Sequence, residues 1–159
     1  MRHWDLEVIF LIETKKKIVG MKKVKVKLGY VNGFYVQRQG KGGSLAMFWR
    51  KEVNLEIRSF SRHHIEAVVT EEVFGFKWRL TSFYGHPETH RRKESWRFLD
   101  TLNHQFRLPW LYFGDFNKIL FEEEKLGGAP RPQQQMEAFQ NIVNKCGLKD
   151  MGYYGVNFT

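Results

Sequence analysis

The chain has 159 residues, 42% of them hydrophobic, which is enough for one domain with a packed core and too few for two. No apolar run approaches the roughly 20 residues that cross a bilayer, and the charged N-terminus is unlike a signal peptide, so we expect an intracellular soluble protein. Lys and Arg outnumber Asp and Glu by 26 to 17, a net charge of +9, which favours a polyanionic partner such as nucleic acid. Cys146 is the single cysteine, which excludes an internal disulfide, and its apolar surroundings predict a core thiol.

The first element expected is a buried strand at residues 6–12, which ends at Glu13. Glu13 either pairs with a surface lysine or supplies a carboxylate to a hard cation such as Mg²⁺. Seven lysines follow between residues 15 and 27, and Val24, Val26 and Leu28 alternate with some of them. This alternation predicts an exposed strand or loop, either simply solvated or used to track phosphates.

A meander of antiparallel strands is predicted next. The glycine-rich segment 29–43 indicates a strand and a flexible turn, and apolar residues then alternate or run together over 44–49, 53–57, 65–69 and 76–84. Residues 71–75 are the expected hairpin between the last two strands. In the last strand we expect Lys77, Arg79 and Thr81 on a solvent-facing side.

Two polar side chains follow directly on this meander. Tyr84 ends the last strand, where its phenol either donates a hydrogen bond to a phosphate or caps the core. His86, between a glycine and a proline, is a candidate acid or base without an identified partner.

Helical periodicity predicts helices at about 89–106 and 133–145. The first turn of the first helix contains three cationic residues, Arg91, Arg92 and Lys93. Cations at a helix N-terminus oppose the helix dipole, so their presence needs a reason other than helix stability. Gly147 is the expected C-terminal cap of the second helix.

Between these helices, residues 109–117 read Pro-Trp-Leu-Tyr-Phe-Gly-Asp-Phe-Asn. The apolar run predicts a buried strand that ends at a glycine. Asp115 and Asn117 follow directly after the end of this strand. One interpretation is an Asx-type turn. The other is that Asp115 faces a cleft, a cation or a hydrogen-bond network, because a desolvated, unpaired carboxylate is costly.

Several motifs together, in their order along the chain, resemble one family. They are Ile12-Glu13-Thr14-Lys15, Gly42-Gly43-Ser44-Leu45-Ala46, Phe83-Tyr84-Gly85, residues 109–117 and Glu124-Lys125-Leu126-Gly127-Gly128, with Asp150-Met151-Gly152-Tyr153 and Asn157-Phe158-Thr159 behind them. The set is similar to the endonuclease/exonuclease/phosphatase superfamily, most closely to the endonuclease domain of plant LINE-type non-LTR retrotransposons. The resemblance covers nearly the whole chain.

The resemblance implies a deoxyribonuclease I-like fold, an α/β (α+β) layered sandwich of two mostly antiparallel sheets with flanking helices. It also implies hydrolysis of phosphodiester bonds with Mg²⁺ or Mn²⁺, DNA as the partner and a nuclear location. Glu13 resembles the metal-ligating glutamate, although Ile12 replaces the usual glutamine, and Tyr84 resembles the tyrosine that contacts the scissile phosphate. Asp115 and Asn117 resemble the pair that positions the attacking water and the phosphate, and Lys15 is a candidate substrate-binding residue.

Two family motifs are absent from the sequence, an N-terminal Trp-Asn-type motif and a C-terminal Ser-Asp-His-type motif. We therefore expect a single partial domain over residues 1–159, truncated at both ends, with weak or no endonuclease activity. The alternative is a non-catalytic, nucleic-acid-binding remnant of a retrotransposon. A phosphatase of the same superfamily is a third alternative, which the positive net charge disfavours. The sequence gives no indication of the oligomeric state.

Overall fold

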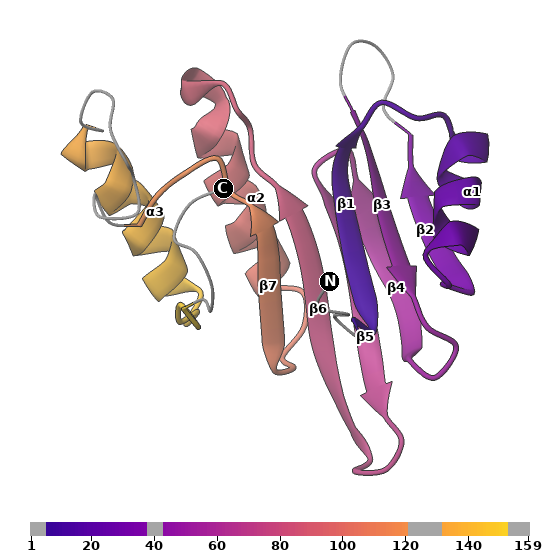
Figure 1. Ribbon diagram of the computed structural model, residues 1–159. Coiled ribbons are helices and arrows are strands. Elements are labelled where there is room, and N and C mark those ends of the chain that lie inside the picture. The colour runs from indigo at the N-terminus through magenta and orange to yellow at the C-terminus, as the bar shows by residue number, and fades with distance from the viewer. Residues whose placement is uncertain (1–5, 38–42, 121–131, 153–159) are drawn as a thin grey trace. The chain divides into compact units, whose positions relative to one another are not determined.

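The computed structural model describes residues 6–37, 43–120 and 132–152 (Figure 1). The chain divides into two compact units, one of residues 1–84 and 108–114 and the other of residues 85–107 and 115–159. It therefore passes from one unit to the other at three peptide bonds, Tyr84–Gly85, Arg107–Leu108 and Gly114–Asp115.

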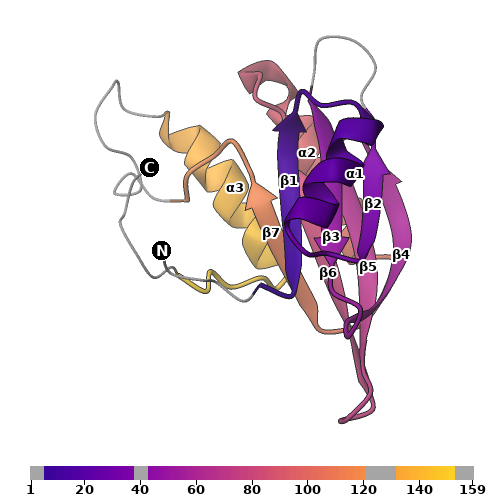
Figure 2. The ribbon, with the colours of Figure 1, turned by 45° about the vertical axis from the view of Figure 1, so that its right-hand side comes forward.

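The first unit contains a three-stranded sheet with helix α1 (Ile18–Lys27) lying over it (Figure 2). Its order is β1 (Val8–Thr14), β3 (Ser44–Trp49) and β2 (Asn32–Val36), with both pairs antiparallel. Leu45 and Met47 of β3 join one buried cluster, whereas Ala46 and Phe48 join a second one with Met21 of α1. The strand is a continuous apolar run because both of its faces are covered.

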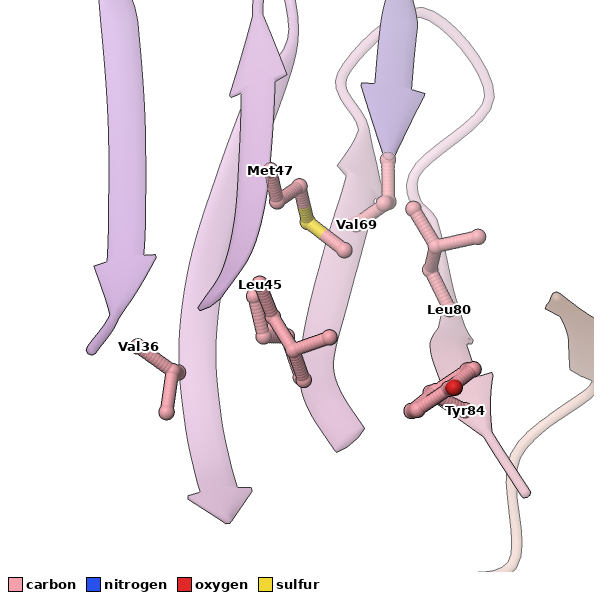
Figure 3. Close-up of a cluster of buried hydrophobic side chains, with 7 residues drawn as sticks. Val36, Leu45, Met47, Val69, Leu80 and Tyr84 are labelled. Atoms are coloured by element: carbon pink, nitrogen blue, oxygen red, sulfur yellow. The ribbon is translucent and has the colours of Figure 1, made fainter. Parts of the chain in front are cut away.

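The second sheet of the same unit has the order β4 (Asn54–Ser61), β5 (His64–Glu71), β6 (Phe76–Tyr84) and β7 (Trp110–Asp115). The β4–β5 and β5–β6 pairs are antiparallel, as the meander predicts. The main core lies between the sheets, where Leu45 and Met47 face Val69, Leu80 and Tyr84 (Figure 3). Two packed sheets with helix α1 over the first of them make the α+β sandwich that the sequence predicts.

Helix α1 corrects the prediction of an exposed strand or loop in the lysine-rich segment. Ile18, Met21 and Val24 recur every three residues, and Met21 is buried against Ala46 and Phe48. Spacing by three or four residues is helical, and lysine and methionine are good helix formers. Val26 and Leu28, which suggested a strand, are exposed on the helix.

The predicted solvent-facing side of β6 is also wrong for Arg79 and Thr81, which are both buried. Arg79 Nε donates to Glu66 Oε1 of β5 over 2.9 Å, and its guanidinium lies 4.2 Å from the ring centroid of Trp110. Trp110 Nε1 donates to Thr81 Oγ1 over 2.8 Å. Polar residues are buried here because they satisfy one another's hydrogen bonds, which hydrophobic periodicity cannot reveal.

The second unit contains the 3-10 turn η1 (Thr89–Arg91), α2 (Arg92–Asn103) and α3 (Gln133–Lys145), close to the two predicted helices. The rings of Trp96 and Phe139 stack across α2 and α3 with centroids 4.7 Å apart. Gly147 follows α3, and its N–H donates to the Asn144 carbonyl, as a C-terminal cap does. Cys146 is half-buried rather than a core residue, and this burial raises the pKa of its thiol. Within the described residues, no helix has the length and apolar composition needed to span a membrane.

Candidate active site

Glu13 lies on a β-bulge near the end of β1. The register of β1 with β3 shifts between Leu11 and Thr14, and Glu13 has φ 52°. The backbone of Gly43 passes so close that a Cβ added there would lie 2.2 Å from Glu13 Cα, so only glycine fits at position 43. A bulge redirects a side chain at a strand end, and the Glu13 side chain is exposed.

Tyr84 ends β6 in the same unit, and its phenol O–H donates a hydrogen bond to Glu13 Oε1. The ring is only 4% exposed because it packs in the core between the sheets (Figure 3). The structure thus shows the alternative in which Tyr84 caps the core, and a hydrogen bond from its phenol to a phosphate stays a prediction. Its ring closes the core while its hydroxyl contacts the predicted metal ligand.

His63 contacts the backbone of Tyr84, and no sequence motif points to it. Tyr84 N–H donates to the His63 carbonyl over 2.7 Å, and His63 Nδ1 lies 2.9 Å from the Tyr84 carbonyl oxygen. Because a carbonyl only accepts, His63 Nδ1 is the protonated ring nitrogen. The rings of His63 and Tyr84 are almost parallel, at 14° with centroids 6.5 Å apart. His63 lies at the turn between β4 and β5, a location that only strand pairing brings next to Tyr84.

Asp115 and Asn117 meet in the second unit. Asn117 N–H donates to Asp115 Oδ1 over 2.7 Å, which is the Asx-type turn that the sequence offers as one interpretation. Asn117 has φ 52°, a left-handed conformation that asparagine adopts more readily than most residues. Asp115 is exposed, and its role in catalysis stays a prediction.

Gly85 joins this turn to the segment that follows β6. Its N–H donates to the Asp115 carbonyl over 2.7 Å, and its carbonyl accepts from Asn117 Nδ2 over 2.9 Å. A Cβ at position 85 would lie 2.4 Å from the Phe116 carbonyl oxygen, so a side chain there would push the two segments apart. Two motifs of the predicted set, Phe83-Tyr84-Gly85 and Gly114-Asp115-Phe116-Asn117, are thus joined by backbone and side-chain hydrogen bonds.

The structure therefore brings the predicted site residues together as two pairs, one in each unit. Glu13 contacts Tyr84 in the first unit, and Asp115 contacts Asn117 in the second. Lys15 is exposed between β1 and α1, and no hydrogen bond or ion pair of its ammonium group is found among the described residues. The motifs at 124–128 and 157–159 and Gly42 lie outside the described residues.

His86 lies in the loop after β6, as the sequence indicates, and it is buried. Its Nε2 lies 3.5 Å from Glu94 Oε2, and its Nδ1 lies 3.9 Å from Glu88 Oε2. Its backbone N–H donates to Ser95 Oγ over 3.1 Å. These contacts give His86 the carboxylate partners that the sequence did not identify, and they fit a residue that holds the start of α2.

The comparisons with known proteins establish the fold. The catalytic domain of human nocturnin, solved with a bound sulfate anion, is 16% identical with a TM-score of 0.50, over 74% of this chain and 53% of that one. ANGEL2, a 2′,3′-cyclic phosphatase solved with adenosine-2′,3′-vanadate, is 18% identical with a TM-score of 0.52, over 74% of this chain and 41% of that one. Both have the deoxyribonuclease I-like fold of the endonuclease/exonuclease/phosphatase superfamily, and the described part of this chain shares it.

This chain spans about half of the nocturnin domain and about two fifths of ANGEL2. No protein-family model and no curated protein sequence matches it. At this level of identity, what ANGEL2 and nocturnin do is a property of those proteins, whereas the fold is common to them and to this chain.

Proposed function

We propose that the protein is a weakly active, metal-dependent phosphodiester hydrolase of the endonuclease/exonuclease/phosphatase superfamily that cleaves nucleic acid, with DNA as its substrate. The observation that carries the proposal is the hydrogen bond from Tyr84 to Glu13, on a bulge of a sandwich with this superfamily's fold. These residues are 71 positions apart and belong to separate sequence motifs. The ordered motifs further support an origin in a plant LINE-type retrotransposon and a nuclear location.

Glu13 is the residue that would hold the metal ion. Among the described residues there is no group of three or more His, Cys, Asp or Glu side chains able to bind a metal. A single exposed carboxylate nevertheless fits Mg²⁺, which keeps several waters and is usually held by one or two carboxylates and the substrate's phosphates. When bound, the ion would neutralise negative charge on the phosphate oxygens.

The remaining residues supply what phosphoryl transfer to water requires. Asp115, exposed and held by the Asx turn, orients the attacking water and accepts its proton. The carboxamide of Asn117 donates a hydrogen bond to the phosphate without adding negative charge. The phenol of Tyr84 does the same once its single O–H turns from Glu13 to the phosphate. The bond from Asn117 to the Gly85 carbonyl fixes the carboxamide before the substrate arrives.

A second candidate function is nucleic-acid binding without catalysis, the remnant that the sequence offers as an alternative. The observation that favours it is the lysine-rich helix α1. Its lysines at 22, 23 and 27 are exposed, and so are Lys15, Lys16 and Lys17 just before it. A dense cationic surface binds phosphates independently of any active site.

Nicking of supercoiled plasmid by the purified protein with Mg²⁺ separates the two functions. We expect nicking that EDTA abolishes and that Asp115→Ala reduces by at least about 100-fold, as loss of an acid or base group does. Binding of the same plasmid should be nearly unchanged by this substitution.

Asp150→Ala is the matched control for Asp115→Ala. Asp150 is also exposed and also accepts a backbone N–H two residues ahead, from Gly152 over 2.9 Å. Loss of one Asx turn is therefore common to both variants, and only Asp115→Ala should lose nicking. Plasmid binding without metal-dependent nicking by the folded protein would favour the binding remnant.

A further inference from the structure

A cavity of about 360 Å³ lies between the two sheets of the first unit. Its lining comes from the start of β1, the turn before β4, the end of β5, the first half of β6 and the middle of β7. Pockets that hold small molecules have volumes of this size. The cavity is therefore large enough for a ligand of several non-hydrogen atoms.

The cavity is separate from the candidate active site. Val8 lines it at the start of β1, whereas Glu13 lies near the end of that strand. Trp78 lines it in β6, whose last residue is Tyr84. At about 3.3 Å per residue, roughly 20 Å of strand separates the cavity from the contact between Glu13 and Tyr84. What the cavity binds therefore does not depend on the proposed function.

Much of the cavity wall is apolar. Val69 of β5 and Leu80 of β6 line it, and both belong to the buried cluster between the sheets (Figure 3). Val8, Trp78 and Phe113 also line it and are partly buried against the same cluster. A ligand with an apolar body would remove more of this surface from water, which favours binding.

The charged side chains of the lining are all acidic, namely Glu7, Glu52 and Glu71. Within the described residues, the lining contains no lysine, arginine or histidine, although the whole chain has a net charge of +9. Glu52 Oε1 lies 3.8 Å from Lys51 Nζ, but both side chains are exposed and such surface pairs interact weakly. The cavity therefore favours a cation over an anion.

Trp78 and Glu71 form a fixed pair in this lining. Trp78 Nε1 donates to Glu71 Oε1 over 3.1 Å. An ionised carboxylate has about four acceptor positions, so Glu71 can accept from a ligand while it also holds the indole. Carboxylates form charge-assisted hydrogen bonds with ammonium groups, and the face of an indole ring attracts cations.

We infer that this cavity is a binding site for an organic ammonium ion. The alkyl chain of the ligand contacts the apolar wall, and its ammonium group is bound by Glu71 beside Trp78. A bare metal ion would gain nothing from the apolar wall. The described residues also contain no group of three or more His, Cys, Asp or Glu side chains able to hold a metal.

Titration of the isotope-labelled protein with hexylammonium, followed by NMR, tests the inference. The indole N–H of Trp78 is the reporter because it donates to Glu71, and Trp78→Phe identifies its resonance. Hexanol and hexanoate are the matched ligands, since each keeps the alkyl chain and replaces the ammonium by a neutral or an anionic group. Ammonium chloride keeps the charge and lacks the chain.

We expect hexylammonium to shift the Trp78 resonance with a Kd of about 1 mM, as suits so small a ligand. Hexanol, hexanoate and ammonium should each bind at least about tenfold more weakly, because each lacks the charge-assisted hydrogen bond or the apolar contact. No shift with hexylammonium, or an equal affinity for hexanol or hexanoate, would overturn the inference.

Glu71→Gln removes the charge, and its carboxamide oxygen can still accept from Trp78. Glu72→Gln is the matched control, because Glu72 also accepts a side-chain hydrogen bond, from Asn54 Nδ2 over 3.0 Å, but does not line the cavity. Glu71→Gln should weaken hexylammonium binding by about tenfold, and Glu72→Gln by much less. Equal effects would show that only net charge matters and would contradict a defined site.

Leu111→Lys provides a second variant, which places an ammonium group on an alkyl chain in the cavity itself. Leu111 lines the cavity and is 37% exposed, so a longer side chain can be accommodated. Leu28→Lys, at a leucine that is 51% exposed at the end of α1, is its control. Leu111→Lys should abolish hexylammonium binding, whereas Leu28→Lys should bind it as the wild type does. Undiminished binding by Leu111→Lys would refute the inference and, because neither DNA nor Mg²⁺ is present, would leave the proposed function standing.

Discussion

At the scale of single residues, Glu13 and Asn117 have strained backbones. They are the non-glycine residues with positive φ in the part of the chain that the structure describes, and both are predicted site residues. Such conformations cost of order 1–3 kcal/mol each and persist where the surroundings enforce them, often at functional sites. Gly43 and Gly85 provide that enforcement here, because each lets a second backbone pass within contact distance.

Tyr84→Phe tests the contact between Tyr84 and Glu13. The ring remains in the core, so the free energy of unfolding should fall by only about 1 kcal/mol for the lost hydrogen bond, as measured by urea denaturation. Nicking should fall by about tenfold or more, because the single O–H that holds Glu13 before the substrate binds, and that is proposed to turn to the phosphate, is lost.

Tyr35→Phe is the control for this substitution. The Tyr35 hydroxyl is buried without a hydrogen-bond partner among the described residues, and burial raises its pKa. Its removal should leave stability unchanged or slightly higher, since an unsatisfied polar group is lost. Equal losses of nicking in the two variants would argue against a special role for Tyr84.

At the scale of elements, β4, β5 and β6 are joined by buried polar groups. Ser59 Oγ donates to Glu66 Oε2 over 2.9 Å and lies 2.9 Å from His64 Nε2. Glu66 in turn accepts from Arg79. Breaking such a buried pair by removal of one partner is costly, so this network fixes which strands pair and in which register.

His64 makes this network sensitive to pH. Burial, and secondarily the charge of His63, lowers the pKa of His64 from 6.5 to about 4. The unfolded chain therefore binds the proton more readily between these values, and the stability from a neutral His64 is present above pH 6.5 and lost as the pH falls toward 4. The full loss is roughly 3 kcal/mol.

We expect His64→Gln to remove this part of the pH dependence. The variant should be less stable than the wild type at pH 7, and the difference should shrink as the pH approaches 4. Urea denaturation at a series of pH values measures it, with His104→Gln at an exposed histidine as the control. A difference that stays constant from pH 7 to pH 4 would contradict a buried, neutral His64.

The sequence predicted elements that hydrophobic periodicity defines and missed those set by tertiary contacts. The strand at 44–49 and the helix at 133–145 agree with β3 and α3 to the residue, because each carries an unbroken apolar pattern. The bulge at Glu13 and the contacts between His63 and the Tyr84 backbone depend on pairing between strands that are separate in the chain. The alternation in β6 predicts a solvent-facing Arg79, although the residue is buried, because its partner Glu66 is brought to it only by strand pairing.

At the scale of the whole molecule, the net charge of +9 is concentrated in part on α1. Such a surface attracts nucleic acid without sequence specificity, and salt weakens this attraction by screening the charges. Helix α1 belongs to the unit that carries Glu13 and Tyr84, but the predicted catalytic residues and the exposed lysines of α1 are different side chains. The contribution of α1 to binding can therefore be removed separately from catalysis.

Replacement of Lys22, Lys23 and Lys27 by glutamine tests the contribution of α1. These lysines are exposed, and glutamine has nearly the helix propensity of lysine, so the fold should be retained. We expect the affinity for a DNA duplex to fall and the slope of log Kd against log salt to decrease by up to about 3, one unit for each lost phosphate contact. Fluorescence anisotropy at several salt concentrations measures both quantities.

Replacement of Lys51, Lys77 and Lys149 by glutamine is the control, because it removes the same charge at exposed positions outside α1. If α1 is the binding surface, this control should change the slope much less than the α1 variant does. If the two variants change the slope equally, only net charge matters and α1 is an ordinary solvated helix. Nicking at saturating DNA should be unchanged in the α1 variant, because helix binding raises the occupancy of the enzyme by DNA and has no part in cleavage of the phosphodiester bond.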